Sequence, residues 1–160
     1  MQWNEIDFDA ATWTVPAERM KCKLPHEVPL SADAMALIRR LEAGRIGKFV
    51  FPGRWSNGPI INYPVWDVVQ RLTGRADSEV SMASPHGFRA SFRSWCRTKK
   101  IRDDVAERCL AHGREDATQA AYDRDEMPKD RRKVMERWSR YLSGADATTN
   151  VVPLRARGGQ

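Results

Sequence analysis

The sequence predicts an α+β fold, in which a small three-stranded antiparallel sheet packs on a mostly helical body. Two observations predict it. Short runs with strand-like alternation occupy the first thirty residues, and from Ser31 onward apolar residues recur at helical spacing. The chain has 160 residues, about the size of one domain, and it shows no internal repeat.

Three segments near the N-terminus are the predicted strands. Residues 5–8 alternate polar and apolar side chains, and residues 12–15 are β-branched or aromatic. A short Asp-Ala-Ala turn separates these two runs. Residues 26–30 form a third run, in which Pro29 marks a strand end or an edge. The polar residues 21–23 lie in the connection before it, so the three runs together predict an antiparallel meander.

The rest of the chain is predicted to be helical. Ser31 is a suitable N-cap for the first helix, and Gly44 ends it. A short apolar run over residues 49–53 ends in a turn. Further helices are expected over residues 62–72, 85–98, 103–111, 115–121 and 127–143.

The expected helices differ in the faces that they present. The first carries apolar residues at helical spacing, namely Ala34, Leu37, Ile38 and Leu41. The helix that Ser84-Pro85 opens has an apolar face of Phe88, Phe92, Trp95 and Cys96, and a basic stripe of Arg89, Arg93 and Arg97. The last helix is expected to bury Val134, Trp138, Tyr141 and Leu142.

Composition excludes several classes of protein. Hydrophobic residues make up 41% and charged residues 30%, as in an ordinary globular chain, and no apolar run reaches the ~20 residues of a membrane helix. The N-terminus lacks a signal pattern, so we expect a cytoplasmic protein with no membrane partner. Lys plus Arg is 27 and Asp plus Glu is 21, a net charge of +6, which weakly favours a polyanionic partner.

Cysteine and histidine spacing does not predict a metal centre. The three cysteines, Cys22, Cys96 and Cys109, are widely spaced and form no C-x-x-C pair. We therefore expect neither a disulfide framework nor a structural metal, and no cofactor is predicted.

A few residues have the chemistry of a phosphate site. His86 and Arg89 lie one turn apart at a predicted helix N-terminus, where free N–H groups favour anions and a guanidinium can bind phosphate oxygens bidentately. His112 precedes Tyr122 by ten residues. A phenol, with a pKa near ~10, needs a proton acceptor or a cationic site before it can attack. Taken singly, each of these residues is more readily explained by a structural role than by a catalytic one.

Taken in order, these residues resemble a known family. The set comprises Lys21 in a strand connection, Ser84-Pro-His-Gly-Phe-Arg89, Leu110-Ala-His112 and Ala121-Tyr122. It is similar to the C-terminal catalytic domain of the tyrosine recombinases, specifically the phage-type integrases of prophages and genomic islands. The flanking stretches Val15-Pro-Ala-Glu-Arg-Met-Lys21 and Arg131-Arg-Lys-Val-Met-Glu-Arg-Trp138 resemble the same group. The resemblance covers about residues 2–143.

The resemblance implies site-specific recombination of DNA and a role for each matching residue. Tyr122 would attack the scissile phosphate and form a 3′-phosphotyrosyl link. Arg89 would bind the phosphate oxygens, His112 would donate a hydrogen bond to one of them, and His86 would assist proton transfer. Lys21 would protonate the departing 5′-oxygen. The family's chemistry requires no metal or cofactor, because cationic side chains bind the phosphate.

Other residues are weaker candidates. Lys23 competes with Lys21 for the lysine role, although counting back from the strand at residues 28–30 favours Lys21. Arg93, Arg97 and Lys23 are candidate DNA contacts. The expected partner is double-stranded DNA at the core of an attachment site. On that DNA the family implies a homo-oligomer, and the isolated chain is expected to be a monomer or a weak dimer.

One departure from the family limits the expected activity. The family's first catalytic arginine would lie before Met1, so no residue here inherits it. Residues 1–144 are expected to form an integrase-like catalytic domain that lacks its N-terminal helix segment, and residues 145–160 a disordered tail. Little recombinase turnover is then expected from this chain alone. The alternatives are a non-catalytic DNA-binding remnant of an integrase and a phosphoesterase that uses His86 and His112.

Overall fold

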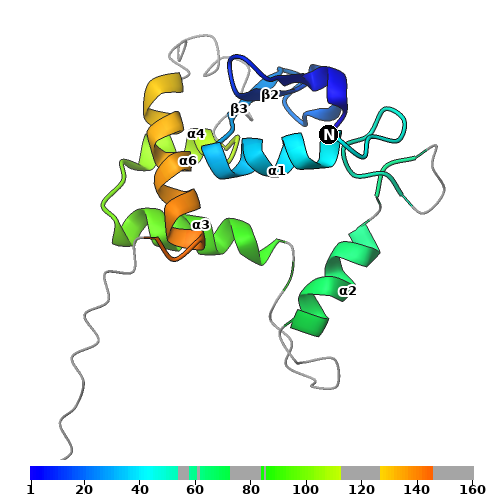
Figure 1. Cartoon of the computed structure of the whole chain (residues 1–160). Coiled ribbons are helices and arrows are strands. Elements are labelled where there is room, and N and C mark those ends of the chain that lie inside the picture. Colours follow the sequence, from blue (N-terminus) through cyan, green and yellow to red (C-terminus); the bar gives the residue numbers. More distant parts are fainter. Residues whose placement is uncertain (54–57, 61, 73–83, 85, 113–126, 146–160) are drawn as a thin grey trace, which may run out of the picture.

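The structure is a computed structural model that describes residues 1–53, 58–60, 62–72, 84, 86–112 and 127–145. Its described part holds a three-stranded antiparallel sheet and five α-helices, so the predicted α+β class is confirmed (Figure 1). No helix among these residues is long and apolar enough to cross a membrane.

The sheet is the predicted meander, with strand order β1-β2-β3. Its strands are β1 (Ile6–Asp7), β2 (Thr12–Val15) and β3 (His26–Pro29), and short 3-10 turns cover Trp3–Glu5 and Ala17–Arg19. Asp7 forms the first turn, because its Oδ1 accepts hydrogen bonds from the backbone N–H groups of Asp9 and Ala10 at 2.9 and 2.7 Å. This turn sets the register that pairs Ile6 with Trp13.

Helix α1 (Ala32–Glu42) closes a first hydrophobic core against the sheet. Its N-cap is the predicted Ser31, whose Oγ accepts a hydrogen bond from the N–H of Ala34 at 3.3 Å. Met35 and Ile38 are buried, while Leu37 on the same predicted face is exposed. The buried members of this first cluster are Trp3, Ile6, Leu30, Met35, Ile38 and Val50.

Helices α3 (Gly87–Thr98), α4 (Asp103–Cys109) and α6 (Pro128–Leu142) form a second hydrophobic core. Its buried members are Phe92, Trp95, Cys96, Val105, Ala106 and Val134. Three of its rings meet edge to face, with ring centroids of Trp138 lying 5.1 Å from Trp95 and 5.4 Å from Phe92. Helix α3 is thereby fixed against α6, with its first turn beneath α1 (Figure 1).

Helix α6 also contacts the first core, through polar side chains. Arg131 is buried and donates a hydrogen bond to the backbone carbonyl of Glu27 in β3. Glu136 Oε1 accepts a hydrogen bond from the N–H of Ala32 at 3.0 Å, at the start of α1. The two cores are therefore joined by one helix.

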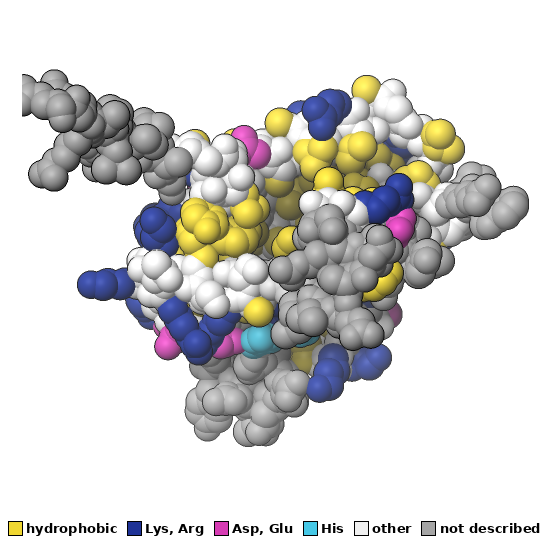
Figure 2. Space-filling model, turned by 90° about the horizontal axis from the view of Figure 1, so that it is seen from below, with side chains coloured by type: hydrophobic (Ala, Val, Ile, Leu, Met, Phe, Trp, Pro, Cys, Tyr) yellow, Lys and Arg dark blue, Asp and Glu magenta, His cyan; other side chains and the backbone are white. Residues whose placement is uncertain are grey.

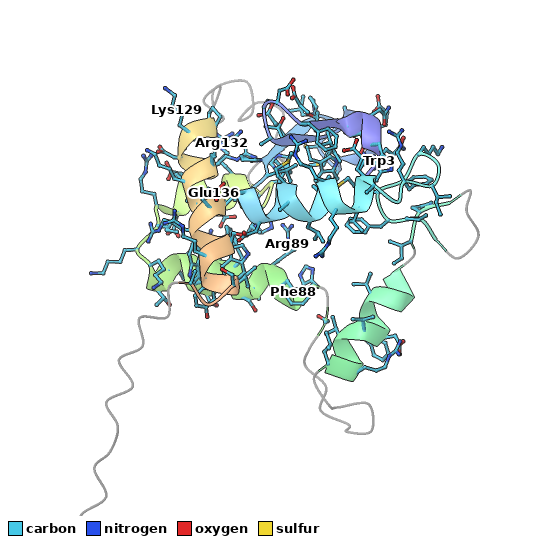
Figure 3. The ribbon with its side chains drawn as sticks, viewed as in Figure 1. Trp3, Phe88, Arg89, Lys129, Arg132 and Glu136 are labelled. Carbon is cyan, nitrogen blue, oxygen red and sulfur yellow. The ribbon has the colours of Figure 1, made fainter. Side chains whose placement is uncertain are left out.

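The ends of two helices differ from the prediction. Phe88 was expected on the buried face of α3, yet its side chain is 58% exposed because it lies in the first turn, beyond the reach of α6 (Figure 3). Tyr141 and Leu142 were expected in the buried stripe of α6 and are 49% and 64% exposed. Helical periodicity identifies a face but does not say how far along that face the neighbouring element extends.

Helix α2 (Asn62–Leu72) has the predicted bounds and stands apart from both cores (Figure 1). Val65, Val68 and Leu72 on it are exposed. The apolar run before α2 joins the first core. Its Val50 is buried there, and the N–H of Val50 donates to the carbonyl of Met1 at 3.3 Å. The predicted helix over 115–121 and the tail from 146 lie outside the described residues.

Candidate functional site

The start of α3 positions the first two candidate residues. Helix α3 begins at Gly87 with His86 as its N-cap, and Ser84 lies just before it, where its Oγ accepts a hydrogen bond from the N–H of Gly87 at 3.1 Å. His86 precedes the first helical residue and is exposed, and its carbonyl accepts a hydrogen bond from the N–H of Arg89 at 3.0 Å. Arg89 is partly buried on the first turn, next to Phe88 (Figure 3).

The end of α4 positions His112 through its backbone. Ala111 adopts a left-handed conformation with φ 56°, which ends the helix. The N–H of His112 then donates to the carbonyl of Glu107 at 2.9 Å, and that of Ala111 to the carbonyl of Arg108 at 3.2 Å. This is the Schellman arrangement, in which the first and second residues past the helix end each donate one backbone hydrogen bond to the last turn. The backbone of His112 is therefore fixed relative to α4.

Arg89 and His112 meet, although they are 23 residues apart in the sequence. Arg89 Nη2 donates to the carbonyl of Leu110 at 2.7 Å and contacts His112 Nε2. The carbonyls at a helix C-terminus carry partial negative charge, so the end of α4 attracts the guanidinium. Two groups that can bind phosphate oxygens are thus brought to one point, and their roles toward DNA stay predictions.

Acidic side chains of α4 contact His112 and the neighbouring Arg93. Glu107 Oε2 lies 2.6 Å from His112 Nδ1, and Glu107 Oε1 forms an ion pair with Arg93. Arg93 also lies 3.5 Å from Asp103. Figure 2 shows histidine surface beside acidic side chains, with Lys and Arg side chains on both sides. Arg93, a candidate DNA contact, has its charge balanced within the protein by two carboxylates, and its contact with DNA stays a prediction.

The other candidates lie elsewhere or outside the described residues. Lys21 is exposed in the connection between β2 and β3, and its approach to the phosphate site stays a prediction. Lys23 is exposed in the same connection with φ 54°, and Arg97 is exposed in the last turn of α3. Tyr122 lies outside the described residues.

Burial makes two cysteines poor nucleophiles. It raises the pKa of the Cys96 thiol to about 11 and also raises the pKa of Cys109. Within the described part of the chain, no three His, Cys, Asp or Glu side chains gather as a metal site would require. The described groups that can bind an oxyanion at this site are the guanidinium of Arg89 and the imidazole of His112.

Sequence reasoning missed the acidic residues of this site. Asp103 and Glu107 are four residues apart, so they share one face of α4. The basic residues of α3 repeat at the same spacing. Two complementary stripes on consecutive helices, one basic and one acidic, are the sequence signal for these contacts. The buried Arg131 and Arg108 gave no such signal.

Comparison with known proteins agrees with the resemblance. The sequence matches the phage integrase family over residues 1–129. Prophage integrase IntA of Escherichia coli K12 is 32% identical over 154 residues, which cover 94% of this chain and 36% of that protein. The integrase of Enterobacteria phage P4 is 31% identical, over 88% of this chain and 35% of its own length.

The integrase of Shigella phage Sf6 is 28% identical, over 89% of this chain and 36% of that protein. The chain thus spans about a third of the length of these curated relatives. No solved structure matches it. Because the family match covers residues 1–129 of 160, the chain belongs to the phage integrase family.

Proposed function

We propose that this chain provides the catalytic portion of a site-specific DNA recombinase that integrates or excises mobile DNA. One observation supports it most directly. Arg89 and His112, supplied by α3 and α4, meet at the end of α4 in a member of the phage integrase family. Neither residue type is unusual alone, but their meeting supplies two groups for the oxygens of a single phosphate.

The proposed reaction exchanges one phosphoester bond for another. The phenol oxygen of Tyr122 attacks the scissile phosphorus, and the bond from phosphorus to the 5′-oxygen breaks. Lys21 protonates that oxygen, and His86 assists transfer of the phenolic proton. Arg89 and His112 stabilise the negative charge on the other phosphate oxygens in the transition state. The 3′-phosphotyrosyl bond preserves the phosphodiester energy, so strand exchange needs no ATP.

The proposed partner is double-stranded DNA at an attachment-site core. The net charge of +6 favours its approach, and Arg97 and Lys23 are exposed cations that could neutralise backbone phosphates. We place the protein in the cytoplasm, as a homo-oligomer on DNA and a monomer or weak dimer without it. Metal and cofactor play no part in this mechanism.

A covalent adduct tests this function. The full chain is first used to select its binding sequence from a random duplex library, and that sequence is then built into a nicked suicide duplex. We expect a slow, denaturant-resistant protein–DNA adduct under single-turnover conditions. Arg89→Ala should slow its formation by ~10²–10³-fold, since a phosphate-binding donor is lost.

Tyr122→Phe is the matched control. It should abolish the adduct and leave the dissociation constant for DNA unchanged, because the ring remains and only the nucleophilic oxygen is removed. An adduct in this variant would contradict the proposal. Sequence-specific binding with a steep salt dependence, but no adduct from the unaltered chain, would support the alternative of a non-catalytic DNA-binding remnant.

A further inference from the structure

Glu107 contacts His112 twice, once with its backbone and once with its side chain. Its carbonyl accepts the N–H of His112 at 2.9 Å, and its Oε2 lies 2.6 Å from His112 Nδ1. The first contact places the backbone of His112 at the end of α4. The second contact fixes the rotation of the imidazole ring from its Nδ1 side, whereas Arg89 contacts the ring only at Nε2; the side chain is 50% exposed.

These contacts also determine which ring nitrogen carries the proton. An ionised carboxylate can only accept, so the hydrogen lies on Nδ1. Arg89 Nη2 can only donate, so Nε2 presents its lone pair to that guanidinium. The bond from Nδ1 to Glu107 persists whether or not Nε2 later gains a proton. Nε2 is therefore the nitrogen that faces a phosphate held by Arg89, and it donates to a phosphate oxygen once it has gained a proton, while Nδ1–H stays bonded to Glu107.

A second interaction holds the Glu107 carboxylate itself. Arg93 pairs with Oε1, which leaves Oε2 for the histidine. The Arg93 side chain is 23% exposed and that of Glu107 33%, so water competes only in part for this pair. Asp103 also pairs with Arg93, at 3.5 Å, but its side chain is 76% exposed, and Glu107 is the carboxylate that contacts the ring.

We propose that Glu107 is a positioning residue for His112, which fixes the ring orientation and the Nδ1–H tautomer so that Nε2 faces the DNA phosphate. This inference rests on the proposed function for the role of His112. Partners of this kind, which act through another side chain, typically change activity by ~10–100-fold when they are removed.

The tautomer of His112 tests the positioning without any activity. Long-range ¹H–¹⁵N spectra of the full chain, recorded at about pH 8.5 where an ordinary histidine ring is neutral, distinguish a proton on Nδ1 from one on Nε2. We expect the Nδ1–H pattern in the unaltered chain and a mixture of tautomers in Glu107→Ala. Glu107→Gln should restore the Nδ1–H pattern, because its amide oxygen can still accept.

Two variants control for the ion pair. Asp103→Asn removes the charge that pairs with Arg93 at 3.5 Å and leaves the contacts of the His112 ring unchanged. Arg93→Gln removes the Arg93–Glu107 pair and leaves the bond from Glu107 to Nδ1. Both should keep the Nδ1–H pattern. Loss of that pattern in Arg93→Gln, with the Glu107 carboxylate still present, would show that the ion pair and not the contact with the ring sets the tautomer, and would overturn the inference.

Adduct formation on the suicide duplex supplies the second readout. Glu107→Ala should slow the single-turnover rate by ~10–100-fold with DNA affinity unchanged within about twofold, and Glu107→Gln should recover most of that rate. An unchanged His112 tautomer in Glu107→Ala would overturn the inference. If the unaltered chain binds DNA but forms no adduct, the proposed function fails, and the tautomer result alone supports or overturns the positioning.

Discussion

Glu5 shows how much one side chain in the sheet region can contribute. Its carboxylate accepts hydrogen bonds from the N–H of Gln2 at 2.8 Å and from Trp13 Nε1 at 3.1 Å, and it pairs with Arg19 at 2.5 Å. Burial by itself raises the pKa of Glu5, but the hydrogen bonds from Arg19, Gln2 and Trp13 outweigh it, and the pKa lies below its usual value. The folded state therefore favours the ionised carboxylate.

This lowered pKa predicts a pH-dependent contribution to stability. Since the folded pKa is below the unfolded one, the contribution is present above the unfolded pKa and is lost as the pH falls through the folded pKa. Glu5→Gln should lower the free energy of unfolding by about 1–2 kcal/mol at pH 7. The difference should shrink towards zero near pH 2.5, as measured by urea unfolding at both values.

Glu18→Gln is the control for Glu5→Gln, because Glu18 is an exposed carboxylate on the neighbouring 3-10 turn. It should change the free energy of unfolding by less than about 0.5 kcal/mol at either pH. An equal loss for Glu5→Gln at pH 7 and at pH 2.5 would show that its cost comes from packing and not from charge.

Single residues of the site could be predicted by type, but their contacts could not. Arg89 and His112 are candidates by residue type, because guanidinium and imidazole groups can bind a phosphate, and the structure brings the two side chains together. Glu107 was missed because its spacing from Asp103 marks a face of α4 but does not say which side chains that face meets. Its contacts with Arg93 on α3 and with His112 depend on how the end of α4 packs against α3.

At the scale of elements, the sequence predicted most of the fold. The strands and the caps could be predicted because their signals are local, such as Ser31 accepting the N–H of Ala34 at 3.3 Å. The extent of each buried face was less predictable. Tyr141 lies at the end of α6 and is 49% exposed, whereas Arg131, near the start of that helix, is only 2% exposed.

Arg131 joins α6 to β3 and gives the prediction at this scale. Its guanidinium donates to the carbonyl of Glu27, and burial lowers its pKa. Arg131→Met roughly preserves the volume of the side chain but removes the donor to the Glu27 carbonyl. Because that acceptor belongs to the backbone, it stays in place and loses this hydrogen bond. We expect the free energy of unfolding to fall by about 2–4 kcal/mol, measured by urea unfolding at pH 7.

Lys133→Met is the matched control on the same helix. The Lys133 side chain is 75% exposed and pairs with Asp130 on the surface of α6. Its replacement should change the free energy of unfolding by less than about 0.5 kcal/mol. A loss for Arg131→Met as small as that for Lys133→Met would mean that the carbonyl of Glu27 finds another donor.

Across the whole molecule, one helix links two hydrophobic cores by different means. The second core includes α6 through Val134 and Trp138, which pack against α3. The first core is joined to α6 by polar contacts, among them Glu136 to the N–H of Ala32 at 3.0 Å and Ser139 Oγ to Asp33 Oδ2 at 2.7 Å (Figure 3). Apolar packing holds α6 against the second core, and hydrogen bonds hold the first core against α6.

This arrangement predicts that the two cores respond unequally to loss of Glu136. Its carboxylate satisfies an N–H in the first turn of α1, where a negative charge is also favoured by the helix dipole. Glu136→Ala should cost the first core about 1–2 kcal/mol, so amide hydrogen exchange in α1 and the sheet should become about 5–30-fold faster. Exchange in α3 and α4 should change little, because α6 packs on them through the second core, of which Glu136 is not a member.

Glu136→Gln and Arg137→Ala complete this comparison. The first variant keeps an acceptor oxygen for Ala32 and loses only the charge, so its effect on α1 should be smaller than that of Glu136→Ala. The second replaces an exposed residue next along the same helix and should leave exchange in both cores unchanged. Equal acceleration in both cores for Glu136→Ala would mean that they open as a single cooperative unit, in which the polar contacts of α6 couple them as tightly as its apolar face does.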